Sequence, residues 1–339
     1  MGTLVSFDIS SDFGFFKKPD VNDFGLTYNM PPKPTVLGII GSIIGMDGFD
    51  KQREEASQLE KLLKILSANN HKKRKDLIAK INLDEIKTVL ANSKFEKRAG
   101  VFELLNRLGD KNENSNLDEL NEILGEWNLE LQYPDFFRKL KHIKIGIRPP
   151  EKNFPFNKIM NKYNSRNSYY YTDKDADTAN ISEQLLIKPT YRIYLYDEDN
   201  KILDEVVRRI QNNNPIFMPY LGKNEFIVSI ENLEKLTDVK PLTKTPEQIH
   251  SVFLKSENNK NKPNIKTNKK KIPGEDGPVT VSGLPLGYKF VEQYPISYSD
   301  EMQYDLHMVE YTSRSDETST ADLENGVMTK VNDYMIYLF

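Results

Sequence analysis

Alternation of apolar and polar residues predicts four strands in the first 240 residues of the chain. The clearest is LKHIKIGIR at 140–148, where isoleucines alternate with polar residues or glycine. Similar alternation marks residues 3–9, 188–196 and 226–230. One face of each strand should therefore enter a core, while the other face carries polar and basic side chains.

A helix rich in glycine is predicted after the first strand, beginning near Pro34 and ending near residue 48. Its apolar residues recur at three- and four-residue spacing, while Gly38, Gly41 and Gly45 form a second stripe. Each interior glycine costs roughly 0.5–1 kcal/mol relative to alanine, so another group should approach the backbone closely. A sheet packed on the glycines is sufficient to explain them. The positive helix N-terminus beside Lys33, which we expect to be exposed, could also bind a phosphate.

A second helix is predicted at 201–211, so the order is strand, helix, strand, strand, helix, strand. This order is the ferredoxin-like or RRM topology of the α+β class. We therefore assign residues 1–240 to one RRM-like domain, which residues 51–133 interrupt. This insertion has the leucine spacing of amphipathic helices, the last of them ending at Gly125, and it carries fifteen basic and fifteen acidic residues.

A long excursion at 151–187 separates the second and third strands, and it is rich in lysine, asparagine and tyrosine. Excursions of this length are usually functional or disordered. Basic residues interleaved with tyrosines favour single-stranded nucleic acid, because bases stack on rings and phosphates attract cations. The loop at 10–23 has the same mixture, with phenylalanines beside Lys17 and Lys18. For 151–187 the alternative is a flexible loop. For 10–23 the alternative is that the phenylalanines pack into the core and the lysines are solvated.

Residues 241–339 change character again, and we expect a Lys/Asn-rich linker followed by a small β-rich C-terminal lobe. Strands are predicted at 278–286, 304–311 and 334–339, with the last one tucked into a sheet.

The composition of the chain argues against a metal site and against a membrane protein. The chain has no cysteine, and its four histidines are never at metal-ligand spacing, so we expect no metal and no cofactor. The net charge of −3 hides a strong separation: residues 138–166 contain nine lysines and arginines against one acid, whereas 292–324 contain nine acids against one base. The sequence has neither a membrane span nor a signal peptide, which predicts a cytoplasmic protein without a membrane partner.

Two segments together carry a family resemblance: TYNMPPKPTVLGIIGSIIG at 27–45 and NPIFMPYLGKNEF at 214–226. In this order, and with the RRM-like strands, they resemble the CRISPR-associated "Cas five" family, the RAMP-type subunit of type I Cascade complexes. The type I-B branch is the most similar. The resemblance covers residues 3–50 and 138–235.

The resemblance implies a non-catalytic subunit in antiviral defence that caps the 5′ handle of the CRISPR RNA (crRNA). Its partners would be the backbone subunit, the large subunit and, indirectly, target DNA. The excursion at 151–187 would form a thumb-like hairpin. Carried onto this chain, the residues expected to contact RNA are Lys17, Lys18, Lys33, Thr35, Arg148, Lys158, Lys162, Tyr163, Arg166, Tyr170, Tyr220 and Lys223.

Two other functions stay open. The first is a metal-independent endoribonuclease that processes repeat RNA, since one branch of the family uses a tyrosine, lysine and histidine set. Ile44 stands where that branch has its tyrosine, the helix at 202–211 has no histidine, and we interpret Lys141 and His142 as a strand edge. The second is a free-standing RRM-like regulator of other RNAs.

Overall fold

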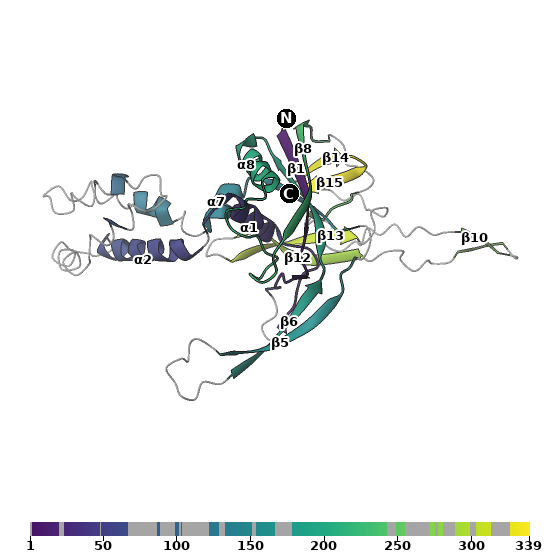
Figure 1. Ribbon diagram of the computed structural model, residues 1–339, viewed down its shortest axis with the longest axis horizontal. Helices are drawn as coiled ribbons and strands as arrows, with labels where there is room; N and C mark the ends of the chain where they lie inside the picture. Colours follow the sequence, from purple (N-terminus) through teal and green to yellow (C-terminus); the bar gives the residue numbers. More distant parts are fainter. Residues whose placement is uncertain are drawn as a thin grey trace. The chain divides into compact units, whose positions relative to one another are not determined.

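Four antiparallel strands form the central sheet in the order β4-β7-β1-β8. They are β1 (Gly2–Ser10), β4 (Lys144–Arg148), β7 (Thr190–Asp197) and β8 (Ser229–Val239). Figure 1 labels two of them, the neighbouring β1 and β8. Helix α1 (Lys33–Ile44) lies between β1 and β4 in the chain, and α8 (Asn200–Gln211) lies between β7 and β8. Both the chain order and the sheet order are those of the ferredoxin-like topology, so the predicted fold class is confirmed.

The computed structural model describes residues 2–19, 24–47, 49–66, 87–88, 99–101, 103, 122–128, 133–150, 154–166, 178–242, 249–254, 271–274, 277–280, 289–298, 303–312 and 326–339. The chain divides into two compact units. The first comprises Met1–Gly45, Leu140–Ser297 and Tyr304–Phe339, and the second comprises Met46–Lys139 and Tyr298–Gln303.

The fourth strand differs from its prediction, because β8 begins at Ser229 and continues to Val239 instead of covering 226–230. Its apolar residues recur every third position, which hides the two-residue period of a strand. The pairing with β1 shifts register twice, and Asn232 and Asp238 have positive φ angles. Bulges of this kind break the alternation that sequence reasoning depends on.

The inner face of the central sheet forms the main core with the two helices. Val5, Phe7 and Ile9 alternate along β1 and are fully buried, as are Ile193 and Leu195 on the neighbouring strand β7. Helix α8 contributes its own buried apolar residues, and α1 is buried along most of its length. The predicted glycine helix is therefore a core element, ending at Gly45 in a left-handed conformation with a φ of 79°.

The outer face of the same sheet is covered by the C-terminal hairpin of β14 (Val327–Val331) and β15 (Tyr334–Leu338) (Figure 1). Tyr194 and Tyr196 of β7 pack against Ile336 and Leu338 in one buried cluster. The fit is close, since a Cβ added at Gly146 of β4 would lie 2.6 Å from Cγ2 of Ile336. Where the sequence predicts a separate C-terminal lobe, the structure joins the last hairpin to the core of the central sheet.

The rest of the C-terminal part contains two small sheets. One joins β9 (Phe253–Leu254), β12 (Lys289–Tyr298) and β13 (Tyr304–Thr312), and the other is a hairpin of β10 (Lys271–Gly274) and β11 (Gly277–Thr280). The predicted last strand does enter a sheet. It pairs with β14, and Phe339 exchanges backbone hydrogen bonds with Ile145.

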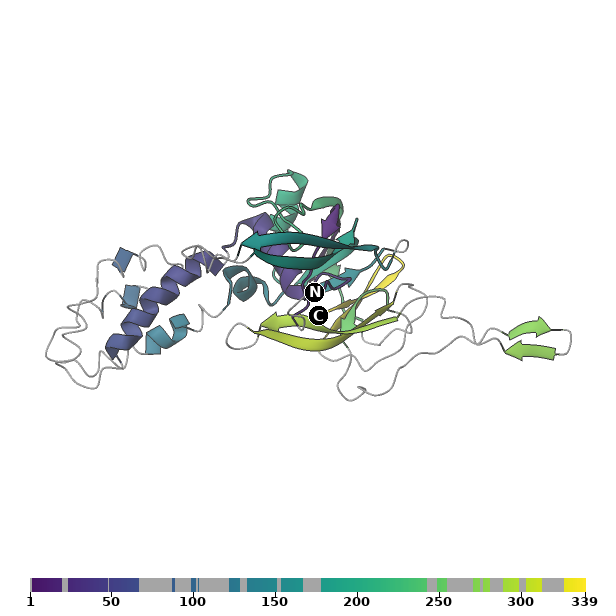
Figure 2. The ribbon, with the colours of Figure 1, turned by 90° about the horizontal axis from the view of Figure 1, so that it is seen from below.

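The excursion between the second and third strands of the sheet contains a long antiparallel hairpin, as the family resemblance implies (Figure 2). Strand β5 (Lys158–Arg166) pairs with β6 (Thr178–Ile187) along its whole length. Two short strands, β2 (Phe13–Gly14) and β3 (Phe24–Gly25), pair with β6 from the N-terminal loop. The phenylalanines of that loop are partly structural, since Phe15 and Phe16 are buried.

The second unit contains the predicted helical insertion. Helix α2 (Phe49–Leu66) buries Leu59 and Leu62, and α7 (Asp135–Leu140) follows later in the chain. The predicted end at Gly125 is wrong, because residues 122–128 are helical. Trp127 in that helix is fully buried and donates to Glu55 of α2. Among the residues described, no helix combines the length and apolarity that crossing a membrane requires.

Candidate nucleic-acid interface

Tyr163 and Lys223, both predicted to contact RNA, lie together at the hairpin, although sixty residues separate them. The Tyr163 hydroxyl of β5 donates to Oε1 of Glu183 on β6 at 3.1 Å. Lys223, in the loop before β8, forms an ion pair with the other oxygen of the same carboxylate. Its ammonium also lies 5.1 Å from the ring centroid of Tyr163 and 5.3 Å from that of Phe15. We call these four residues the Glu183 cluster.

Glu183 determines the charge state of Lys223 in the Glu183 cluster. Partial burial would lower the pKa of Lys223, but the hydrogen bond and the charge of Glu183 outweigh it and raise the pKa. The ammonium therefore stays charged at neutral pH. Glu183 is only 8% exposed, whereas Tyr163 is 37% exposed. The cluster thus combines an accessible aromatic ring with a fixed cation, which is the combination that single-stranded nucleic acid favours.

A tight loop carries Tyr220 and Lys223. Backbone bonds join Leu221 to Phe226 and Val228 to Pro219, and Gly222 between them has a φ of 85°. The loop is fastened to the N-terminal segment because the amide of Phe15 donates to the carbonyl of Leu221. Tyr220 is 42% exposed.

A second carboxylate, Glu292 of β12, plays a comparable role for Lys18. It forms an ion pair with Lys18 and accepts a hydrogen bond from the hydroxyl of Tyr311. Lys158 of β5 belongs to the same neighbourhood: burial lowers its pKa, the charge of Glu292 opposes that shift and the charge of Lys18 adds to it. Lys18 is thus paired with a carboxylate and Lys158 is half-buried, whereas Lys17 and Lys162 are exposed.

Lys33 is buried, which contradicts the expected exposure. Its ammonium donates to the carbonyl oxygen of Phe339 at 2.8 Å and lies 5.8 Å from that residue's ring centroid. Burial first, and the charge of Lys144 second, lower its pKa from 10.5 to about 8. Lys33 therefore anchors the end of the C-terminal hairpin segment to the start of α1. Thr35, two residues further along α1, is half-buried.

Arg148 lies on the covered face of the central sheet, at the end of β4. Its guanidinium stacks 3.8 Å from the ring centroid of Tyr334 in β15. Burial raises the pKa of the neighbouring Tyr194, and the charges of Arg148 and Arg192 oppose that shift. The predicted basic strand end is therefore engaged by the C-terminal hairpin.

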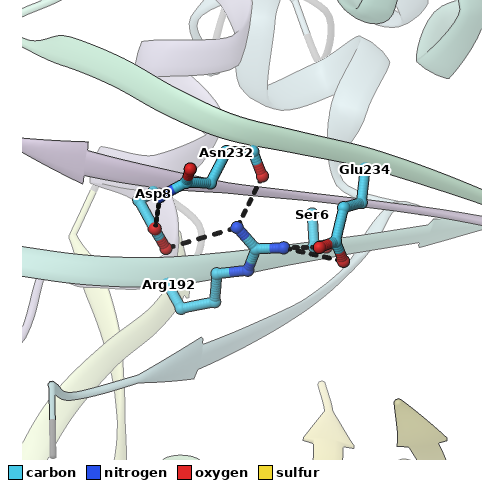
Figure 3. A network of polar contacts seen from close by, with 5 residues as sticks. All are labelled: Ser6, Asp8, Arg192, Asn232 and Glu234. Carbon is cyan, nitrogen blue, oxygen red and sulfur yellow. Dashed lines mark hydrogen bonds and ion pairs between the residues drawn. The ribbon is translucent and has the colours of Figure 1, made fainter. Parts of the chain in front are cut away.

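Arg192 of β7, which the sequence did not single out as functional, is held in a polar network on this face (Figure 3). Its guanidinium donates to the Ser6 hydroxyl at 2.8 Å and to the carbonyl of Asn232 at 2.6 Å. It also forms ion pairs with Asp8 and Glu234. The network joins β7, β1 and β8 and neutralises the cation in place.

Two predicted RNA-binding residues remain, Arg166 and Tyr170. Arg166 ends β5, where its backbone pairs with Thr178, and Tyr170 lies outside the described residues. Within the described ranges, no group of three or more acidic or histidine side chains has the arrangement of a metal site.

One histidine, His142, is hydrogen-bonded to a buried carboxylate. Nε2 of His142 lies 3.2 Å from Oδ2 of Asp197, which is only 6% exposed as a residue, while the His142 side chain is 48% exposed. The other oxygen of Asp197 accepts from the amide of Asp199. A buried carboxylate therefore orients an accessible imidazole beside Lys141.

These features define the class of the protein: a ferredoxin-like α+β fold with a projecting hairpin whose aromatic and basic residues form a candidate nucleic-acid interface. The model of the family described as CRISPR-associated protein (Cas_Cas5) matches residues 4–275, and the chain belongs to this family. No curated protein matches the sequence.

Three solved structures are also similar to the chain. One is described as a CRISPR RNA-guided surveillance complex, with 8% identity, a TM-score of 0.36 and coverage of 95% of this chain and 92% of the other. The second, a Cas protein, has 8% identity, a TM-score of 0.36 and coverage of 92% and 96%. The third, a CRISPR protein from Archaeoglobus fulgidus, has 11% identity, a TM-score of 0.34 and coverage of 99% and 98%.

Proposed function

We propose that this protein is a non-catalytic subunit of a type I CRISPR Cascade complex, of the I-B branch, that binds and caps the 5′ handle of the crRNA. In this role it contacts the backbone and large subunits directly and target DNA indirectly. The observation that carries the proposal is the family match over residues 4–275.

The geometry supports RNA contact at the hairpin rather than on the sheet. An RRM binds bases on the outer face of its central strands. Here the corresponding tyrosines, Tyr194 and Tyr196, are buried beneath β14 and β15, and Arg192 is neutralised. The hairpin instead presents Lys162 and Tyr163, with Tyr220 exposed on the neighbouring loop. This arrangement argues against a free-standing regulator that works as an ordinary RRM.

Replacing Lys158 and Lys162 with alanine should weaken binding of handle RNA and flatten its salt dependence. Each phosphate contact on a single strand contributes roughly 0.7 to the slope of log K against log salt, so the double variant should lose about 1.4. The measurement is fluorescence anisotropy of a labelled handle RNA over a salt series.

Lys201→Ala is the matched control, because Lys201 is an exposed lysine on α8 outside the proposed interface. Its slope should equal that of the wild type. An unchanged slope in the Lys158/Lys162 double variant would remove both residues from the RNA contact.

The endoribonuclease is retained as a second candidate because of the His142–Asp197 pair. A buried carboxylate that orients an imidazole is the usual support of a general base. The non-catalytic proposal predicts that purified protein leaves repeat RNA intact in EDTA over hours. A single cut within the repeat, lost in His142→Asn, would instead establish the enzyme and identify its base.

A further inference from the structure

Glu183 contacts two of the residues expected to bind RNA. It accepts a hydrogen bond from Tyr163 and forms an ion pair with Lys223. It lies on β6 directly opposite Asn161, on the same side of the hairpin as Tyr163. Tyr163 is its diagonal neighbour across the strands, within reach of a long side chain. One carboxylate thus links the hairpin to the loop at 220–223.

Both partners of the Glu183–Lys223 ion pair are largely buried, so each charge depends on the other for compensation. The Glu183 side chain is 10% exposed and Lys223 is 21% exposed. Removing one partner of such a pair leaves the other charge without compensation. The pair therefore holds the Lys223 ammonium against the Tyr163 ring instead of letting a long, flexible lysine sample solvent.

The arrangement leaves binding capacity at both groups. An ammonium has three donors, and among its resolved contacts Lys223 uses one on Glu183. Tyr163 keeps more than a third of its surface exposed, although its hydroxyl is engaged. A nucleotide could therefore stack its base on the ring while its phosphate approaches the ammonium.

We propose that Glu183 is a positioning residue for RNA binding: it fixes the Tyr163 ring and the Lys223 ammonium so that together they hold one nucleotide of a single-stranded RNA. This inference rests on the proposed function. It assigns a favourable role to a negative charge inside an RNA interface, which electrostatics alone would disfavour.

The sign of the effect provides the test. Glu183→Gln removes a negative charge, so nonspecific electrostatics would tighten RNA binding, whereas loss of positioning should weaken it by about tenfold, the size of a coupling of 1.4 kcal/mol. The probe is single-stranded RNA with the 5′ handle sequence of the host repeat, measured by anisotropy. Glu225→Gln is the control, because Glu225 is an exposed carboxylate of the same loop, and its removal should leave binding unchanged or slightly tighter.

A double-mutant cycle separates positioning from simple damage to the fold. If Glu183 acts through Lys223, Glu183→Gln should cost less than about twofold in affinity when it is combined with Lys223→Met. Tyr163→Phe, which keeps the ring and removes only the hydroxyl link, should also weaken binding at an unchanged melting temperature. It serves as the test if Glu183→Gln does not fold.

Failure of the proposed function and failure of the positioning role give different results. Wild-type protein that does not bind handle RNA would overturn the proposed function. Wild-type binding together with equal affinity in Glu183→Gln and Tyr163→Phe would overturn the positioning role alone. A loss that is the same with and without Lys223 would also overturn it.

Discussion

Gly222→Ala should destabilise the protein by roughly 2–5 kcal/mol, combining a left-handed backbone that L-residues avoid with an overpacked contact. The φ angle at Gly222 is 85°, and an added Cβ would overlap the backbone oxygen of Phe15. The loop at 220–223 would have to leave the N-terminal segment. Chemical denaturation monitored by circular dichroism would measure the loss, and handle RNA affinity should fall with it.

Gly125→Ala is the matched control. Gly125 lies in the helical segment 122–128, and a Cβ there would meet nothing within 4 Å. Alanine in a helix interior is favoured over glycine by roughly 0.5–1 kcal/mol, so this variant should be as stable as the wild type or slightly more stable. Equal stability of Gly222→Ala and Gly125→Ala would show that the loop at 220–223 is not held as described.

The fold was predictable where apolar residues alternate along a strand. Isoleucines alternate along β4, and β1 and β7 have comparable patterns, so the positions of these three strands follow from period alone. Strand β8 was misplaced because its bulges and three-residue spacing obey no strand period. The packing of β14 and β15 on the outer face was also beyond prediction, since it depends on shape at Gly146 rather than on a local pattern.

The candidate site was predictable in composition but not in pairing. Lysines beside aromatic residues marked Lys18, Tyr163 and Lys223, and the structure places the last two together. Their carboxylate partners carry no local signal, since Glu183 is 40 residues from Lys223 and Glu292 is 274 residues from Lys18. Which lysines are exposed and which are paired is decided by tertiary contacts of this range.

The exposure of Lys33, at the start of α1, was predicted wrongly because its partner is also distant in sequence. Next to a helix N-terminus, and between prolines, Lys33 has the local features of a phosphate ligand. The C-terminal segment, 306 residues away, covers it and supplies the carbonyl that its ammonium binds. A local motif therefore cannot distinguish a ligand-binding lysine from one that secures the chain.

The burial of Lys33 leads to a prediction about pH. Below about pH 8, Lys33 is protonated in both the folded and the unfolded chain, and the fold bears the cost of the buried charge. Between about 8 and 10.5 the unfolded chain keeps the proton that the folded chain releases. The unfolded state then binds more protons, so the free energy of unfolding contributed by this residue rises with pH. The gain should be on the order of 2–3 kcal/mol by pH 10, at 1.36 kcal/mol per pKa unit.

Comparison with Lys33→Met isolates this contribution, because the other groups that titrate over the same range are shared. Urea denaturation at pH 7 and at pH 10 should show the stability of the wild type rising relative to that of Lys33→Met. The control is Lys64→Met, because the Lys64 side chain is 66% exposed on α2. The stability difference between wild type and Lys64→Met should be the same at both pH values. Parallel profiles for wild type and Lys33→Met would mean that the Lys33 ammonium is solvated in the folded protein. A solvated ammonium would return Lys33 to the residues available to an RNA phosphate, whereas a rising difference confirms that it serves to fasten the C-terminal segment to α1.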